Sequence, residues 1–92
     1  MRPLTHALPG ALVLLLRDTP LSDGKVGFAW RAAVGPNLER VTSVRLEARI
    51  LIVEAADAHW AREIVRSSGV ILTRLKTLLG HDTIERILVR EP

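Results

Sequence analysis

The chain has 92 residues, of which 48% are hydrophobic and 25% charged, a composition typical of one small soluble globular domain. It contains no cysteine, which excludes a disulfide framework, a thiolate nucleophile and a cysteine-rich zinc site, and which agrees with a reducing cytoplasm. Thirteen basic residues against ten acidic ones give a net charge of +3, and eleven of the thirteen are arginine, which favours a polyanionic partner.

The first element that we expect is a short helix from about Ala11 to Arg17, between the helix breakers Pro9-Gly10 and Thr19-Pro20. Its apolar run is far shorter than the ~20 residues of a membrane span, and no signal-peptide cleavage site follows it. We therefore interpret it as a buried helix and expect no membrane association.

A second helix should follow the stretch from Leu21 to Val26, which has the composition of a loop and offers Ser22 or Asp23 as a helix cap. The helix should run to about Val34, where Gly35-Pro36 breaks it before a last turn. Its inner face is expected to carry Phe28, Ala29, Ala32 and Ala33, with Trp30 at the edge.

From Ser43 the hydrophobic period changes to two, which predicts a half-buried strand. Arg49 to Ala55 is so rich in β-branched residues that we expect a central strand covered on both faces. The turn between the strands falls near Glu47-Ala48-Arg49, where no glycine or asparagine supplies a positive φ, so the turn type stays open. A third strand is expected from Ile84 to Arg90, with Ile87 and Val89 facing away from Arg86, Leu88 and Arg90.

The strongest helical signal runs from Asp57, a good N-cap, to Leu79, and Gly80 ends it. Ser67-Ser68-Gly69 interrupts this segment with weak helix formers, which predicts two helices or one kinked helix. The apolar residues fall within about 140° of the helical wheel. They are Ala61, Ile64, Val65, Ile71, Leu72, Leu75, Leu78 and Leu79.

This order of elements predicts a single α+β domain over residues 1–92, with helices packed against a three-stranded sheet. Residues 1–22 would form the N-terminal helix and loop, and residues 23–90 the core.

The sequence shows no catalytic constellation. His6, His59 and His81 have no partner at helical spacing and no carboxylate cluster beside them, and no serine lies in a nucleophile-elbow context. A phosphate-binding loop of the Gly-x-x-x-x-Gly-Lys-Ser/Thr type is also missing from the sequence, so the protein could supply no nucleotide switch of its own. We expect a non-enzymatic protein with no metal, no cofactor and no small-molecule substrate.

Gly24-Lys25-Val26-Gly27 matches the Gly-x-x-Gly pattern that clamps a nucleic-acid backbone in KH domains. It precedes the Trp30 helix instead of joining the paired helices after the strands. We therefore interpret it as a plain loop.

Basic side chains are predicted to line the outer face of the long helical segment, the hairpin and one face of the last strand. Because Glu63 and Glu85 lie among them, a merely solvated surface is the alternative. With three aromatic residues in the chain, contact with single- or double-stranded DNA would be electrostatic. The candidate nucleic-acid-binding residues are Arg62, Arg66, Arg74, Lys76, Arg45, Arg49, Arg86 and Arg90.

Trp30 and Trp60 each lie at the edge of an apolar arc. An indole at such a position commonly packs on the core with its N–H exposed to water. The alternative is that both tryptophans are partner-binding residues, because tryptophan is enriched at interface hot spots.

Two blocks of the sequence together resemble a known family. Residues 28–38, FAWRAAVGPNL, resemble a signature of Trp, two residues, a small or apolar residue, Val-Gly, two residues and Leu. Residues 51–54, LIVE, leading into residues 59–64, HWAREI, resemble a strand followed by Trp-Ala-x-Glu-Leu, and residues 75–87 also agree. These are features of the DciA family, and the resemblance runs from about Phe28 to Arg90.

The resemblance implies a KH-like domain of the second type, with the order α-β-β-α-α-β and an extra N-terminal helix. It implies a bacterial, cytoplasmic protein that binds DNA and the replicative DNA helicase, and that assists helicase loading in DNA replication. Two departures are visible: Arg49 stands where members usually have a glycine in the hairpin turn, and almost no extension follows the domain before Pro92. Many members carry a long flexible extension beside the domain; if their helicase contact needs it, this chain should contact the helicase with the folded domain itself.

Two other functions are compatible with the same fold and charge, because a fold does not define a function. One is a KH-like RNA-binding protein of ribosome or RNA metabolism, which should prefer structured RNA to DNA. The other is a structural protein-interaction domain, which should bind neither nucleic acid nor helicase.

Overall fold

The computed structural model describes residues 10–91. His6 and the first part of the expected N-terminal segment lie outside these residues. The described chain forms an α+β fold, as the sequence predicts. Its elements are α1 (Gly10–Asp18), α2 (Asp23–Val34), α3 (Pro36–Arg40), β1 (Thr42–Glu47), β2 (Ile50–Ala55), α4 (Ala58–Arg66), α5 (Ser68–Leu79) and β3 (Arg86–Arg90).

The three strands form a mixed sheet in the order β1-β2-β3. β1 and β2 are an antiparallel hairpin, and β2 and β3 are parallel, with Ile50 opposite Arg86 and Glu54 opposite Arg90. The prediction that β2 is the central strand is confirmed, but the expectation that both of its faces are covered is wrong, because the described helices pack on one face only and Glu54 on the other is exposed. Because parallel neighbours need a crossover, α4 and α5 connect β2 to β3.

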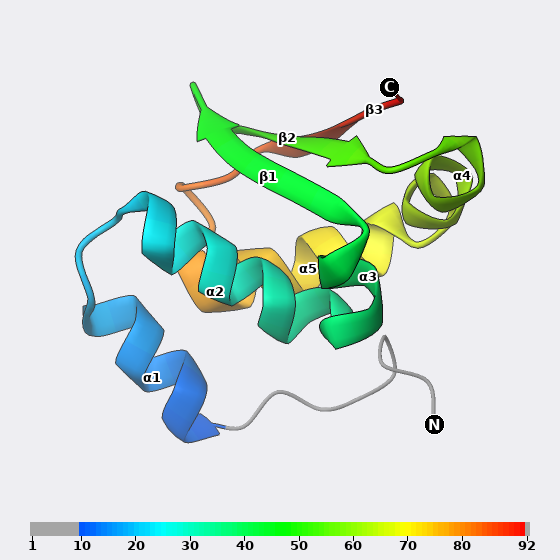
Figure 1. Ribbon diagram of the computed structural model, residues 1–92. Coiled ribbons are helices and arrows are strands. Elements are labelled where there is room, and N and C mark those ends of the chain that lie inside the picture. Colours follow the sequence, from blue (N-terminus) through cyan, green and yellow to red (C-terminus); the bar gives the residue numbers. More distant parts are fainter. Residues whose placement is uncertain (1–9, 92) are drawn as a thin grey trace.

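Helices cover one face of the sheet, and Figure 1 shows no helix on the opposite face. Along each strand, alternate side chains point to the two faces. On the covered side Val44, Val53 and Val89 pack in the core together with Leu51 and Ile87. The other side, which we call the open face, carries Ser43, Arg45 and Glu47 from β1, Ile50, Ile52 and Glu54 from β2, and Arg86, Leu88 and Arg90 from β3.

The first turn of α2 was expected to be a loop, and this expectation is wrong. Ser22 caps the helix by accepting a hydrogen bond from the Lys25 N–H at 3.1 Å, so the Gly-x-x-Gly segment lies inside α2. Lys25 is 8% exposed, and its Nζ donates to the Thr19 carbonyl at 2.6 Å. The cap and this buried amine together hold a glycine-rich turn in helical form.

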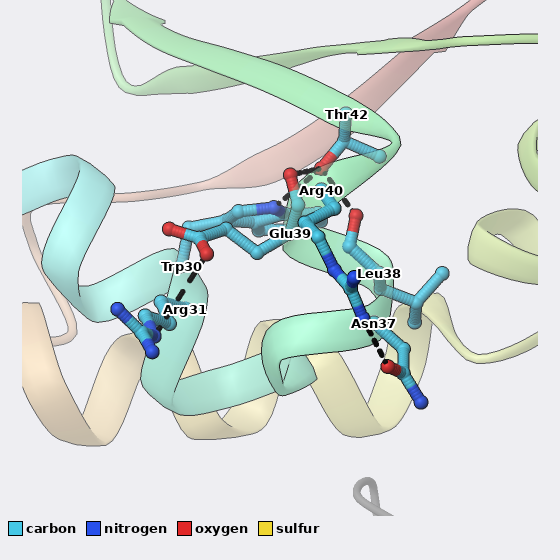
Figure 2. A network of polar contacts seen from close by, with 7 residues as sticks. All are labelled: Trp30, Arg31, Asn37, Leu38, Glu39, Arg40 and Thr42. Carbon is cyan, nitrogen blue, oxygen red and sulfur yellow. Dashed lines mark hydrogen bonds and ion pairs between the residues drawn. The ribbon is translucent and has the colours of Figure 1, made fainter.

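Trp30 lies in the core and not at its edge, which corrects the sequence interpretation. Its side chain is 2% exposed, and its indole N–H donates to the Thr42 hydroxyl at 2.9 Å. Thr42 donates in turn to the Leu38 carbonyl at 2.8 Å, so α2, α3 and β1 meet at this hydroxyl (Figure 2). Phe28, which was expected on the inner face, is 53% exposed, because residues two apart lie about 200° apart on a helix.

The interrupted segment after the sheet is two helices, as one of the two predicted alternatives requires. Asp57 caps α4 by accepting from the Trp60 N–H at 3.0 Å, and Ser67 separates α4 from α5. Ile71 and Leu75 are fully buried on the expected inner face of α5. Val65 was also expected on the buried side of this segment. It lies on α4 and is 59% exposed, because one helical wheel drawn through both helices cannot describe two helices with different axes.

The hairpin turn places two ordinary residues in the left-handed region. Ala48 has φ 50° and Arg49 φ 67°, and two positive φ values in a two-residue loop are those of a type I′ turn. The Arg49 carbonyl accepts from the Glu85 N–H at 2.7 Å, and Arg49 Nε donates to the Asp82 carbonyl at 3.0 Å. The turn therefore also anchors the segment that enters β3.

We expect Thr42→Val to destabilise the fold by about 1–3 kcal/mol, because it leaves the buried Trp30 N–H without an acceptor. The free energy of unfolding would be measured by urea denaturation. Ser43→Val, on the open face of the same strand, is the matched control and should change stability by less than about 0.5 kcal/mol. Equal stabilities for the two variants would contradict this role of Thr42.

We expect Ala48→Gly to stabilise the fold by roughly 0.5–1 kcal/mol. The left-handed conformation costs an L-residue about 1–2 kcal/mol, more than the extra chain entropy that glycine loses on folding. Ala32→Gly, in the middle of α2, should instead destabilise by at least about 1 kcal/mol. A loss of thermal stability in the Ala48 variant would show that this residue has no strain to release.

Candidate nucleic-acid interface

The exposed side of α4 carries two of the predicted arginines. Arg62 and Arg66 are one turn apart and both exposed. Arg66 forms an ion pair with Glu63 at 3.2 Å while its side chain is still 76% exposed, so this pair leaves it accessible. For Arg62 the described part of the chain provides neither an ion pair nor a side-chain hydrogen bond.

A hollow of about 390 Å³ lies between α4 and the end of β3. Its walls are apolar where α4 faces the strand and charged at the rim. The lining residues are Ala61, Arg62, Val65, Arg66, Val89 and Glu91. The structure thus brings the two α4 arginines to the border of a concave surface.

Arg86 and Arg90 are exposed at the two ends of β3, and their side chains share the open face. In residues 10–91 neither of them has an ion pair or a side-chain hydrogen bond. At about 3.3 Å per residue, their α-carbons are roughly 13 Å apart. They therefore present two guanidinium groups in one row.

Arg45 lies on the same open face but is engaged by acids from two strands. Its Nε donates to Glu47 at 2.6 Å and its guanidinium contacts Glu54 at 3.1 Å. The hydrogen bond and the charge of Glu47, followed by the charge of Glu54, raise the pKa of Arg45 above its ordinary value. A phosphate would have to compete with two carboxylates for this side chain.

Three other predicted cations are placed differently from the free arginines. Arg49 contacts the Asp82 carbonyl and lies 3.8 Å from Glu85. Arg74 does not lie free on the outer surface of α5: it donates to the Ala33 carbonyl at the end of α2, at 3.2 Å, which corrects the sequence interpretation. Lys76 is half-buried on the same helix. Arg49 and Arg74 thus make contacts that hold the fold together.

The two tryptophans have different surroundings. Trp30 is too deeply buried to offer a partner any surface, so the expectation that it binds a partner is withdrawn. Trp60 is half-buried against the core, and its ring meets the His59 ring edge to face with centroids 5.0 Å apart. Its role as a partner-binding residue stays a prediction.

Large apolar side chains are exposed on α1, on α2 and in the link between them, a feature that the sequence interpretation missed. Leu14 and Leu15 are 67% and 65% exposed, and Leu21 and Phe28 are more than half exposed. The signal was present in the sequence, because the run ALVLLL has no polar side and a helix made of it cannot bury every leucine against one core. In Figure 1 α1 lies at the end of the molecule opposite α4.

Across the described residues 10–91, no group of three His, Asp or Glu side chains could hold a metal ion. Over the same range, no helix has both the length and the apolar character needed to cross a membrane.

The fold and its surfaces define a small α+β domain with exposed arginines on α4 and β3 and an apolar surface at its other end. The chain belongs to the DciA family: it matches the family described as Dna[CI] antecedent, DciA over residues 3–89. No curated protein and no solved structure matches the chain. Family membership indicates a role related to helicase loading in bacterial replication.

We expect Arg74→Gln to destabilise the fold by about 1 kcal/mol, because it removes a charged donor from a carboxyl-terminal carbonyl of α2. Arg62→Gln removes the same charge from an exposed position and should stay within about 0.5 kcal/mol of the parent. The comparison would use the denaturant concentration at the midpoint of unfolding, for variants whose unfolding free energies depend on denaturant with the same slope. Identical midpoints would mean that the Arg74 contact contributes nothing to stability.

Proposed function

We propose that this chain is a non-enzymatic, KH-like module that binds DNA and the replicative helicase and assists helicase loading. The observation that carries the proposal is membership in the DciA family over nearly the whole chain. Apart from the short helix α3 between α2 and β1, the order α2-β1-β2-α4-α5-β3, preceded by α1, supports the KH-like topology of the second type. The exposed arginines and the exposed apolar surface support two separate partners.

DNA binding is supported by the surface around the α4–β3 hollow. Arg62 and Arg66 border this concave surface, whereas Arg90, at the end of the neighbouring strand, has its side chain on the open face. Guanidinium groups bind phosphate oxygens in a bidentate fashion, and exposed ones release counterions from DNA when they do so. Glu63 and Glu91 lie in the same region and weaken its positive electrostatic potential. We therefore expect a modest affinity for DNA that falls as the salt concentration rises.

Helicase contact is supported by the apolar surface of α1 and α2. Leu14 and Leu15 are neighbours on α1 and both are largely exposed, and exposed large apolar side chains of this kind are typical of protein interfaces. Because α1 and α4 lie at opposite ends of the molecule (Figure 1), one domain could hold helicase and DNA at the same time. The protein would then act by bringing the two together through binding energy alone.

The double variant Arg62→Gln/Arg66→Gln tests the DNA surface. It should bind DNA of any sequence more weakly. The slope of log affinity against log salt concentration should become shallower by the amount that about two phosphate contacts contribute. Arg31→Gln/Arg40→Gln removes the same charge from α2 and α3 and is the matched control. Equal loss in both variants would mean that net charge, and not this surface, determines binding.

The double variant Leu14→Ser/Leu15→Ser tests the helicase surface by co-elution with the replicative helicase of the same bacterium. We expect co-elution to be lost while DNA affinity is unchanged, with Val70→Ser as the exposed apolar control on α5. Tighter binding of structured RNA than of DNA, without helicase co-elution, would favour the RNA-binding alternative. Binding of neither nucleic acid nor helicase would leave a structural interaction domain.

A further inference from the structure

β3 is an edge strand of the sheet. It has one neighbour, β2, and within residues 10–91 no other strand pairs with its far side. An edge of this kind presents unpaired N–H and C=O groups to which another chain can add as a strand. The side chains along β3 determine which kind of added strand this edge would bind.

The alternation of backbone hydrogen bonds along the sheet shows which N–H and C=O groups of β3 face its free edge. Beyond the end of the hairpin, the Ala56 N–H donates to the Val41 carbonyl at 2.8 Å, which makes Thr42 and Ala55 a non-hydrogen-bonded pair. The peptide groups of Leu51 and Val53 therefore point toward β3. In a parallel pair of strands, each of these residues forms its hydrogen bonds with the two β3 residues immediately before and after its Cα partner. This leaves the peptide groups of Ile87 and Val89 facing the free edge.

The side chains along this edge form a charged pattern on the open face. Arg86, Leu88 and Arg90 point to that face in a row, and the two arginines have no acidic partner in the described chain. A strand added to β3 would place its own alternate residues directly opposite these three. Acids opposite the arginines and an apolar residue opposite Leu88 would complement the row.

The other face of the same edge has a different character. Val89 points to the covered side, where the hollow continues past it to Ala61 and Val65 of α4. An added residue opposite Val89 would direct an apolar side chain into this hollow. Glu91 lines the end of the hollow, so an acid on this face would meet a like charge.

Two other occupants suit the edge less well. A second copy paired antiparallel in the register centred on Leu88 would set Arg86 of one copy opposite Arg90 of the other, and like charges directly opposite are destabilising. A nucleic acid could neutralise the arginines, but it has no regular row of N–H and C=O groups to pair with Ile87 and Val89.

We propose that the free edge of β3 binds an extended acidic segment of a partner protein as a fourth strand. The segment carries two acids four residues apart, opposite Arg86 and Arg90, with an apolar residue opposite Leu88 and another opposite Val89. This partner surface is separate from the apolar surface of α1 and does not depend on the helicase assignment.

Two labelled peptides of equal composition test the register. The first, Ser-Glu-Val-Val-Val-Glu-Ser, has its acids four apart and matches the edge in either direction; the second, Ser-Val-Glu-Val-Glu-Val-Ser, has them two apart. Fluorescence anisotropy should show at least tenfold tighter binding of the first peptide, with affinity falling as salt rises. Glu91→Gln should leave binding of the first peptide intact or tighten it. Equal affinity of the two peptides, or no binding at millimolar concentration, would overturn the proposal.

Charge reversal tests the two arginines without removing the edge. Arg86→Glu/Arg90→Glu should bind the first peptide at least tenfold more weakly and should instead bind Ser-Lys-Val-Val-Val-Lys-Ser. The neutral variant Arg86→Gln/Arg90→Gln should be intermediate, and Arg31→Gln/Arg40→Gln should bind like the parent. A reversed variant that keeps its affinity for the acidic peptide would contradict the proposed contacts.

Amide hydrogen exchange locates the bound strand on the parent protein. The first peptide should slow exchange at Ile87 and Val89, while Leu88, which already faces β2, stays unchanged. Protection at other amides only would place the peptide elsewhere and overturn the proposal. Protection of Ile87 and Val89 by an oligonucleotide but not by the peptide would also overturn it.

Discussion

The parallel pairing of β2 with β3 is the constraint on which the rest of the structure depends. Parallel neighbours need a long crossover, and α4 and α5 supply it on one face of the sheet. The crossover begins at the carboxyl end of β2, so α4 lies beside the end of β3 and brings Arg62 near Val89. The opposite face is covered by no helix of the described chain, and for this reason the charged side chains of Arg45, Arg86 and Arg90 can lie on it.

Periodicity predicted the elements well because it reports which side of a regular element is buried. The change to a period of two at Ser43 indicated the first strand, and the dense β-branched run after Arg49 indicated the central one. The weak helix formers at Ser67-Ser68-Gly69 indicated the break between α4 and α5. Each of these signals is local, so it needs no knowledge of what the element packs against.

The errors concern features that depend on residues far away in the chain. Phe28 and Trp30 are both large and aromatic, and the one that turns inward is the one whose N–H finds Thr42 twelve residues later. Arg74 resembled a solvated arginine because its acceptor, the Ala33 carbonyl, is 41 residues away in the sequence. Counting arginines therefore overestimated the free positive charge, since Arg45 and Arg49 are also engaged by acids.

The buried amine of Lys25 has a consequence for limited proteolysis. Trypsin needs a basic side chain and a few residues of extended backbone, and Lys25 offers neither while its Nζ holds the Thr19 carbonyl and its backbone lies in the first turn of α2. Cleavage there requires the link between α1 and α2 to open first. The rate of cleavage after Lys25 therefore reports how often the link between α1 and α2 opens, and it can be read from the time course of a single digestion fragment.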